Sequence, residues 1–187
     1  MHFVVTLSCP DRPGIVRALA EGVVSVGGNI VENAQFSDPV TGTFCMRTHF
    51  EADATEVEEV RAALLAQLAG FDPVLGLRPV EVRRRALIMV SRFDHCLVDL
   101  LYRWQIGELP VEIPVVVSNH EDCREIVERA GIEFVHLPVT RDSKSAAEAA
   151  LLALVEEHRV DFVVLARYMQ VLSDDLCRTL SGRVINI

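Results

Sequence analysis

The apolar residues change their spacing once along this chain, and the change separates two kinds of fold. Up to about residue 82 they recur at two-residue intervals, as in half-buried strands, or at three- and four-residue intervals, as in amphipathic helices. From Arg84 onward the strands are short unbroken apolar runs, which is typical of a parallel sheet covered on both faces. These runs are ALIMV, IPVVV, FVHL, FVVLA and VINI. We therefore predict two α/β domains, residues 1–82 and 84–187, joined near Glu81–Arg85.

The first domain is predicted to follow the order strand, helix, strand, strand, helix, strand. The strands are expected over 3–7, 29–37, 44–50 and 74–80, and the helices over 15–26 and 57–68. Asp11 is the expected cap of the first helix, and Thr55 with Glu58 forms an expected capping box before the second. This βαββαβ order is the ferredoxin-like plan.

The second domain alternates strand and helix every twenty-odd residues, which predicts a doubly wound parallel sheet. Its first helix is expected to begin at Asp94, its second to stop at Gly131, and its third to follow a capping box of Ser145 and Glu148. The run VINI ends at Ile187, where a complete domain would normally continue. We therefore expect a fragment of a longer protein.

Charge and composition exclude several classes of partner. Lys and Arg number 18 against 27 Asp and Glu, a net charge of −9 that repels nucleic-acid backbones and anionic lipid surfaces. Apolar runs all fall short of the roughly 20 residues of a membrane helix, and the N-terminus lacks the pattern of a signal peptide. A cytoplasmic protein is therefore expected.

The five cysteines predict neither a disulfide framework nor a structural metal site. They are odd in number and widely spread, and no two are spaced as CxxC. Cys45, Cys96 and Cys123 fall within predicted strands or helices, where we expect them to be small buried apolar residues.

Ligands of an open parallel sheet bind beyond the carboxyl ends of its strands. The first such loop, SRFDHCLVDLL, contains no glycine, so neither a dinucleotide loop nor a phosphate-binding loop is present and no nucleotide cofactor is expected. Arg92 and His95 are the candidate active-site residues of this loop. A solvent-facing histidine in a first helical turn is the alternative for His95.

Two further segments of the second domain carry candidate site residues. The loop ARYMQVLSDD places large apolar residues beyond a strand end, where they either wall a flat hydrophobic pocket or belong to the ordinary core. Asn186, near the end of the last strand, can donate to a developing oxyanion. The alternative is a buried amide bonded to the backbone.

The first domain offers a candidate effector site. SCPDRPG joins a strand to a helix, so Asp11 and the free amides that follow Gly14 can hold the ammonium and carboxylate groups of an amino acid. Gly28 and Asn29 are expected to border the same crevice. A well-capped turn explains Asp11 equally well.

These segments together resemble one known family. CPDRPGIVRALAEGVVSVGGNIVENAQF and TGTFCMRTHF are similar to the ACT domain of formyltetrahydrofolate deformylases, and RRRALIMVSRFDHCLVDLL, VVVSNH, VVLARYMQVLS and VINI are similar to their catalytic domain. The resemblance implies hydrolysis of 10-formyltetrahydrofolate to formate and tetrahydrofolate, with no metal and no cofactor beyond the folate substrate. It also implies that Met169, Val171 and Leu172 line the pterin pocket.

The resemblance further implies that Asn186 belongs to a catalytic set of asparagine, histidine and aspartate. In the family the last strand continues as INIHHSFLP or similar, so the histidine would follow Ile187 and the aspartate would come some tens of residues later. Water would attack the formyl carbon with the help of the aspartate and histidine, while Asn186 and the histidine stabilise the oxyanion. We therefore expect the 187-residue chain to be inactive by itself.

Two other functions stay open at this stage. One is an amino-acid sensor without catalysis, built on the ACT-like domain. The other is a folate-dependent formyltransferase of the glycinamide ribonucleotide type, which needs a glycine-rich loop after the first strand, where this chain has SRFDH. ACT-like domains are expected to pair side by side through free strands, so a homo-oligomer is predicted.

Overall fold

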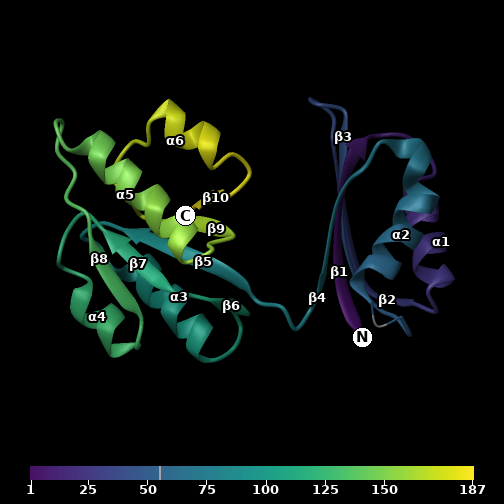
Figure 1. Ribbon diagram of the computed structural model, residues 1–187, viewed down its shortest axis with the longest axis horizontal. Coiled ribbons are helices and arrows are strands. Elements are labelled where there is room, and N and C mark those ends of the chain that lie inside the picture. The colour runs from purple at the N-terminus through teal and green to yellow at the C-terminus, as the bar shows by residue number, and fades with distance from the viewer. Residues whose placement is uncertain (55) are drawn as a thin grey trace. The chain divides into compact units, whose positions relative to one another are not determined.

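A computed structural model describes residues 1–54 and 56–187 of the chain. The chain divides into two compact units, Met1–Val82 and Arg83–Ile187, which run from purple to blue and from teal to yellow in Figure 1. Among the described residues, no helix has the length and apolar character that crossing a membrane requires.

The N-terminal unit is an antiparallel sheet with helices on one face (Figure 1). Its elements are β1 (His2–Pro10), α1 (Ile15–Ser25), β2 (Asn29–Asp38), β3 (Thr43–Glu51), α2 (Val57–Leu68), the 3-10 turn η1 (Ala69–Phe71) and β4 (Val74–Pro79). The strands lie in the order β2-β3-β1-β4. The predicted βαββαβ order is thus confirmed.

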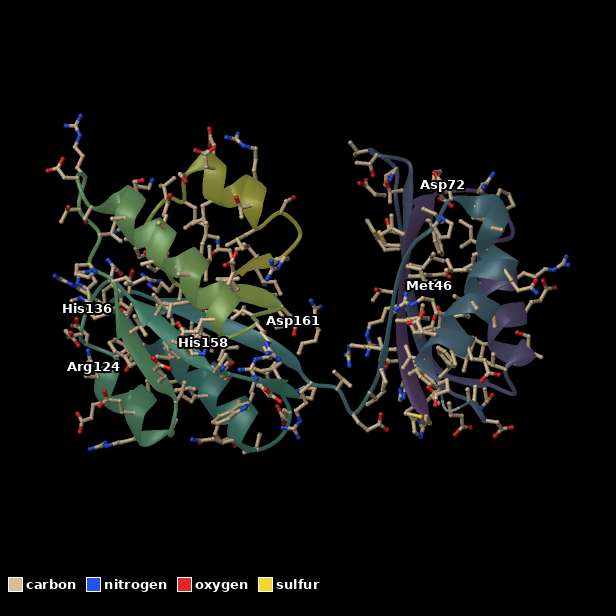
Figure 2. All side chains as sticks on the ribbon, viewed as in Figure 1. Met46, Asp72, Arg124, His136, His158 and Asp161 are labelled. Carbon is tan, nitrogen blue, oxygen red and sulfur yellow. The ribbon has the colours of Figure 1, made fainter. Side chains whose placement is uncertain are left out.

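Alternation along the central strands builds the core of this unit. Phe3, Val5 and Leu7 of β1 face the helices together with alternate residues of β3, among them Met46, which is labelled in Figure 2. The rings of Phe3 and Phe50 are fully buried and stack with their centroids 5.6 Å apart. Strand β2 lies at the sheet edge, and most of its residues are exposed.

Local details of the N-terminal unit differ from two expectations, and a third is not tested. Helix α1 starts after Gly14, whose φ of 102° turns the chain, so Asp11 is not its cap; the Asp11 backbone N–H instead donates to the Gly42 carbonyl. Cys45 is exposed because it alternates with buried residues on the outward face of β3. The expected capping box of Thr55 and Glu58 lies outside the described residues, because Thr55 is not among them.

The C-terminal unit is a parallel sheet with helices on both faces (Figure 1). Its elements are β5 (Arg84–Val90), α3 (His95–Gln105), β6 (Val111–Glu112), β7 (Val115–Ser118), α4 (Arg124–Arg129), β8 (Glu133–His136), α5 (Lys144–Glu157), β9 (Phe162–Ala166), α6 (Asp174–Thr179) and β10 (Val184–Asn186). The strand order is β10-β9-β5-β7-β8, and β6 pairs with β5. Each predicted apolar run contributes a strand.

Alternate residues of the buried strands face two separate cores. Ala86, Ile88 and Val90 of β5 pack against α3 and α4, whereas Leu87 and Met89 pack against α5 and α6. Burial on both faces explains why this strand reads as an unbroken apolar run.

The helix starts in this unit are only partly as predicted. Asp94 occupies the position before α3, but its side chain makes no capping hydrogen bond among the described residues. Helix α5 begins at Lys144 after Ser143, so the capping box of Ser145 and Glu148 is wrong. Cys123 is buried at the start of α4, as expected, and Cys96 is half-buried.

Candidate functional site

The strand order places a ligand crevice at the carboxyl ends of β5 and β9. Chain order reverses at β5, which has β7 on one side and β9 on the other. Loops that follow such neighbouring strands diverge and leave a crevice between them. The loops concerned here are 91–94 after β5 and 167–173 after β9.

The loop after β9 exposes large apolar side chains. Met169 is 65% exposed and Val171 is 84% exposed, whereas Leu172 packs against the core beneath α5 and α6. The interpretation as ordinary core is therefore correct for Leu172 alone. Exposed apolar side chains clustered on one loop are typical of a binding surface.

A cavity lies beside this loop. Val171 and Leu172 form its wall together with Tyr168 and with side chains from the ends of three strands and from α5. The other lining residues that carry polar groups are Lys144, Glu148 and Gln170. Met169 is not part of this wall. The cavity is thus lined mainly by apolar side chains with a few polar groups among them, and its volume is about 20 Å³.

Burial in this cavity raises the pKa of Tyr168 above its ordinary value, and the carboxylate of Glu148 adds to the shift. The tyrosinate absorbance of Tyr168 is the difference between the absorbance of the parent and that of a Tyr168→Phe variant. We expect this difference to develop only above a pH of about 10. Because the folded chain disfavours the tyrosinate, the free energy of unfolding should fall as the pH rises through that range. Spectrophotometric titration of both proteins measures this, and a Tyr168 titration centred below 10 contradicts it.

Glu148 fixes the far end of the same loop. Its carboxylate accepts hydrogen bonds from the backbone N–H and the hydroxyl of Ser173. Ser173 in turn accepts from the Leu176 N–H at 3.2 Å and caps α6. The serine that bonds to Glu148 is therefore Ser173, 25 residues away in sequence, and not Ser145 of the predicted capping box.

The loop after β5 is exposed and contacts the loop after β9. Arg92, Phe93 and His95 are all exposed, so His95 faces solvent at the first position of α3. The guanidinium of Arg167 lies 5.0 Å from the centre of the Phe93 ring. Arg167 has a φ of 52°, a conformation that non-glycine residues seldom adopt and that often occurs at functional sites.

Two residues that the sequence analysis did not single out are buried at this edge of the sheet. Ser91 follows β5 directly, Asn119 follows β7 directly, and they are 4% and 7% exposed. The Ser91 hydroxyl donates to Asn119 Oδ1 at 2.8 Å and accepts from the Met169 N–H at 3.0 Å. The available signal was a serine that immediately follows an unbroken apolar run.

Asn186 lies at the same edge. It belongs to β10, where it pairs with Leu165 of β9, and its side chain is exposed. Within residues 1–187, no described segment buries this amide. The backbone of Ile187 bonds to Leu165 and Arg167, which keeps the end of β10 beside the loop after β9.

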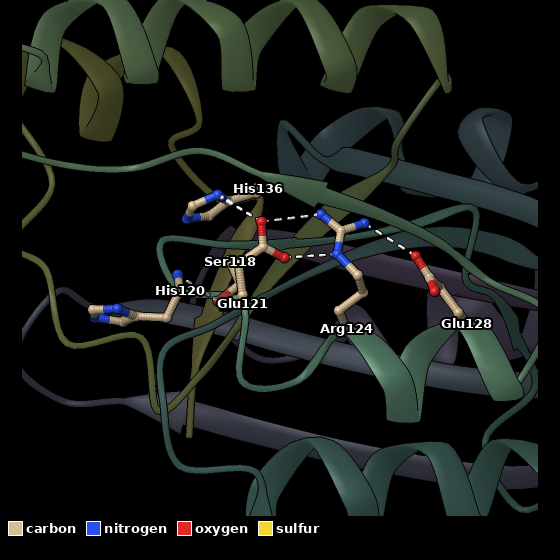
Figure 3. A network of polar contacts seen from close by, with 6 residues as sticks. All are labelled: Ser118, His120, Glu121, Arg124, Glu128 and His136. Atoms are coloured by element: carbon tan, nitrogen blue, oxygen red, sulfur yellow. Dashed lines mark hydrogen bonds and ion pairs between the residues drawn. The ribbon is translucent and has the colours of Figure 1, made fainter.

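A polar network orders the carboxyl ends of β7 and β8 (Figure 3). Arg124 makes two hydrogen bonds to the carboxylate of Glu121, at 2.6 and 3.2 Å, and a third to Glu128 at 3.0 Å. His136 Nδ1 lies 2.9 Å from Glu121 Oε1. These contacts, Arg124 first, lower the pKa of Glu121. The network anchors the loop after β7 at the surface.

No metal centre is built into the part of the chain that the structure describes. Within residues 1–54 and 56–187, histidine, cysteine and carboxylate side chains do not gather in threes as a metal ion would require.

The candidate effector residues of the N-terminal unit do not share one crevice. Asp11 and Gly14 precede α1, whereas Gly28 and Asn29 follow it. An 11-residue helix is about 16 Å long, more than one free amino acid can span. Asn29 donates instead to the Glu51 carboxylate at 3.3 Å. The expected single crevice is therefore wrong within one chain.

Comparison with known proteins first defines the class. The formyl transferase family matches residues 84–187, which is the whole parallel-sheet unit apart from its first residue. A phosphoribosylglycinamide formyltransferase from Brucella melitensis is 30% identical, with a TM-score of 0.51, over 56% of each chain. The C-terminal unit is thus a formyltransferase-type domain.

Relatives that match both units narrow the family. A formyltetrahydrofolate deformylase from Corynebacterium sp. (strain P-1) is 44% identical over all of this chain and 66% of its own length. The crystal structure of a formyltetrahydrofolate deformylase from Burkholderia mallei has a TM-score of 0.90 and 37% identity over 99% of this chain and 66% of that one. The chain belongs to the formyltetrahydrofolate deformylase family, and it spans about two thirds of the length of these relatives.

Proposed function

We propose that this protein acts in the hydrolysis of 10-formyltetrahydrofolate to formate and tetrahydrofolate. The observation that carries the proposal is the position of exposed Met169 and Val171 at the switch point, on the same sheet edge as Asn186. A flat apolar ring can cover these side chains and remove them from water. The adjoining cavity of about 20 Å³ is too small to enclose a pterin ring, so on this proposal the ring lies outside it. Lys144, Glu148 and Gln170 of its lining carry polar groups that can meet the nitrogen and oxygen atoms of the ring.

Asn186 is proposed to act on the formyl group. Its exposed amide can donate to the oxygen that becomes negative when water attacks the formyl carbon. The reaction needs no metal or organic cofactor on this proposal, because the histidine and aspartate implied by the family would move the protons. The loop after β5 has exposed Arg92 and Phe93 where a phosphate-bearing acceptor would need close backbone approach, so water is the favoured acceptor.

A chimeric protein tests this function. Residues 1–187 would be joined to the C-terminal third of the Corynebacterium relative and assayed with 10-formyltetrahydrofolate. Formate and tetrahydrofolate are expected in equal amounts without any ribonucleotide. Consumption of the formyl group only when glycinamide ribonucleotide is present would support the formyltransferase alternative. Isothermal titration of residues 1–187 with tetrahydrofolate tests the folate site separately.

The N-terminal unit is proposed to be an ACT-type regulatory domain of a cytoplasmic homo-oligomer. The exposed edge strand β2 offers unpaired backbone groups to a second copy, and Asn29 lies at its start. Pairing of two copies would allow Asp11 and Gly14 of one chain to meet Gly28 and Asn29 of the other around an amino acid. Sedimentation with and without added glycine or methionine tests both points, and a monomer at micromolar concentration contradicts them.

A further inference from the structure

Three loops meet at one buried hydroxyl group. The loops follow β5, β7 and β9, and the hydroxyl belongs to Ser91. The partners of its oxygen are Asn119 Oδ1 at 2.8 Å and the Met169 N–H at 3.0 Å. In addition, the Cys123 thiol donates to the Ser91 carbonyl at 3.5 Å. Segments 28 and 78 residues apart in sequence are therefore tied to this single residue.

The direction of these hydrogen bonds is fixed by the number of protons. A backbone N–H can only donate, so the Ser91 oxygen must accept from Met169. The hydroxyl then has one proton left, and it goes to the amide oxygen of Asn119. The Ser91 hydroxyl thus both donates and accepts, and the Ser91 and Asn119 side chains are buried.

Tyr168 and Leu172 pack against the core, and the part of the loop after β9 that lies between them is held mainly by hydrogen bonds. Met169 and Val171 are mostly exposed, so apolar packing holds neither of them. The loop is bonded to Ser91 at Met169 and to Glu148 at Ser173, and the most exposed residue, Val171, lies between these two attachments. Loss of the Ser91 attachment would leave Met169 free to move while the start of α6 stays in place.

We propose that Ser91 is a positioning residue for ligand binding, which with Asn119 holds the backbone of 169–172 in its ligand-binding conformation. The inference rests on the proposed function, because it takes the ligand of this loop to be a folate. Ser91 does not contact the ligand in this account. It acts through the Met169 backbone. Because the loop is already ordered in the folded chain, ligand binding does not have to order it, and less conformational entropy is lost on binding.

A pair of alanine variants tests the role. Ser91→Ala removes the acceptor of the Met169 N–H, whereas the control Ser118→Ala removes an equally buried hydroxyl at the end of β7 that accepts only from the His120 N–H. In residues 1–187, Ser91→Ala is expected to weaken tetrahydrofolate binding about tenfold and Ser118→Ala less than about threefold. Ser91→Thr, which keeps the hydroxyl, should restore binding. Amide hydrogen exchange over 168–172 should become faster in Ser91→Ala only.

The outcomes separate the two proposals. If the wild type binds tetrahydrofolate and Ser91→Ala binds equally well with unchanged exchange, the positioning role is overturned and the proposed function stands. If the wild type does not bind, residues 1–187 do not form the proposed folate site by themselves, the chimeric protein still tests the proposed function, and exchange alone decides whether Ser91 fixes the loop. If Ser91→Ala does not fold, Asn119→Ala replaces it, because the loss of the proton acceptor should loosen the same loop; unchanged exchange in that variant overturns the role.

Discussion

Replacing Asn186 by alanine is expected to lower the rate of 10-formyltetrahydrofolate hydrolysis by about a hundredfold or more in the chimeric protein. The exposed amide is the one group at the end of β10 that we assign to the developing oxyanion. Removal of one such donor typically costs two to three orders of magnitude in kcat. The measurement is formate release at saturating substrate, with folate binding measured in parallel.

The control for this variant is Ile185→Val on the same strand. Ile185 is 52% exposed, and the change removes one methylene group without altering any hydrogen bond of β10. The hydrolysis rate of Ile185→Val should therefore equal that of the parent. Equal rates for Asn186→Ala and the parent would show that the amide does not stabilise the transition state.

Replacing Phe50 by alanine is expected to destabilise the N-terminal unit by about 3–5 kcal/mol. Phe50 is fully buried on β3 and stacks on Phe3 of β1, so its removal leaves a cavity between the sheet and the helices. A loss of this size is comparable to much of the total stability of a small domain. Urea denaturation of the whole chain, followed by circular dichroism, measures the change in the free energy of unfolding.

Phe36 provides a matched control in the same sheet. It lies on β2 and is 63% exposed, so Phe36→Ala removes the same atoms from a site that solvent already reaches. At protein concentrations where β2 does not pair with a second copy, its effect on the free energy of unfolding should be within about 0.5 kcal/mol of zero. A similar loss in both variants would mean that the core of this unit is not organised around β1 and β3 as described.

Single-chain geometry changes the interpretation of the N-terminal unit. The sequence places Asp11 and Asn29 at the two ends of one helix, and α1 keeps them apart by its full length. Only an interface between copies can join them. The regulatory proposal therefore depends on oligomerisation, which sedimentation tests directly.

The amino-acid sequence by itself determined the order of the elements and the sheet edge at which the candidate site is proposed. Unbroken runs such as ALIMV and FVVLA predict strands buried on both faces, and β5 and β9 are the strands that they form. Met169 then had to lie beyond the end of one strand and Asn186 at the end of another, because the edge of a parallel sheet follows from strand length and direction alone. The spacing of apolar residues within one helix or strand is a local property, so it can be recognised without knowing which other elements pack against it.

Tertiary structure alone decided which polar groups meet. Glu148 has a serine three residues before it in sequence, yet it bonds to Ser173, because α5 and α6 pack on the same face of the sheet. Ser91 and Met169 are 78 residues apart, and only the pairing of β5 with β9 brings them together. Spacing rules describe neighbours within one helix or strand, whereas hydrogen bonds between loops depend on the strand order, which no local pattern encodes.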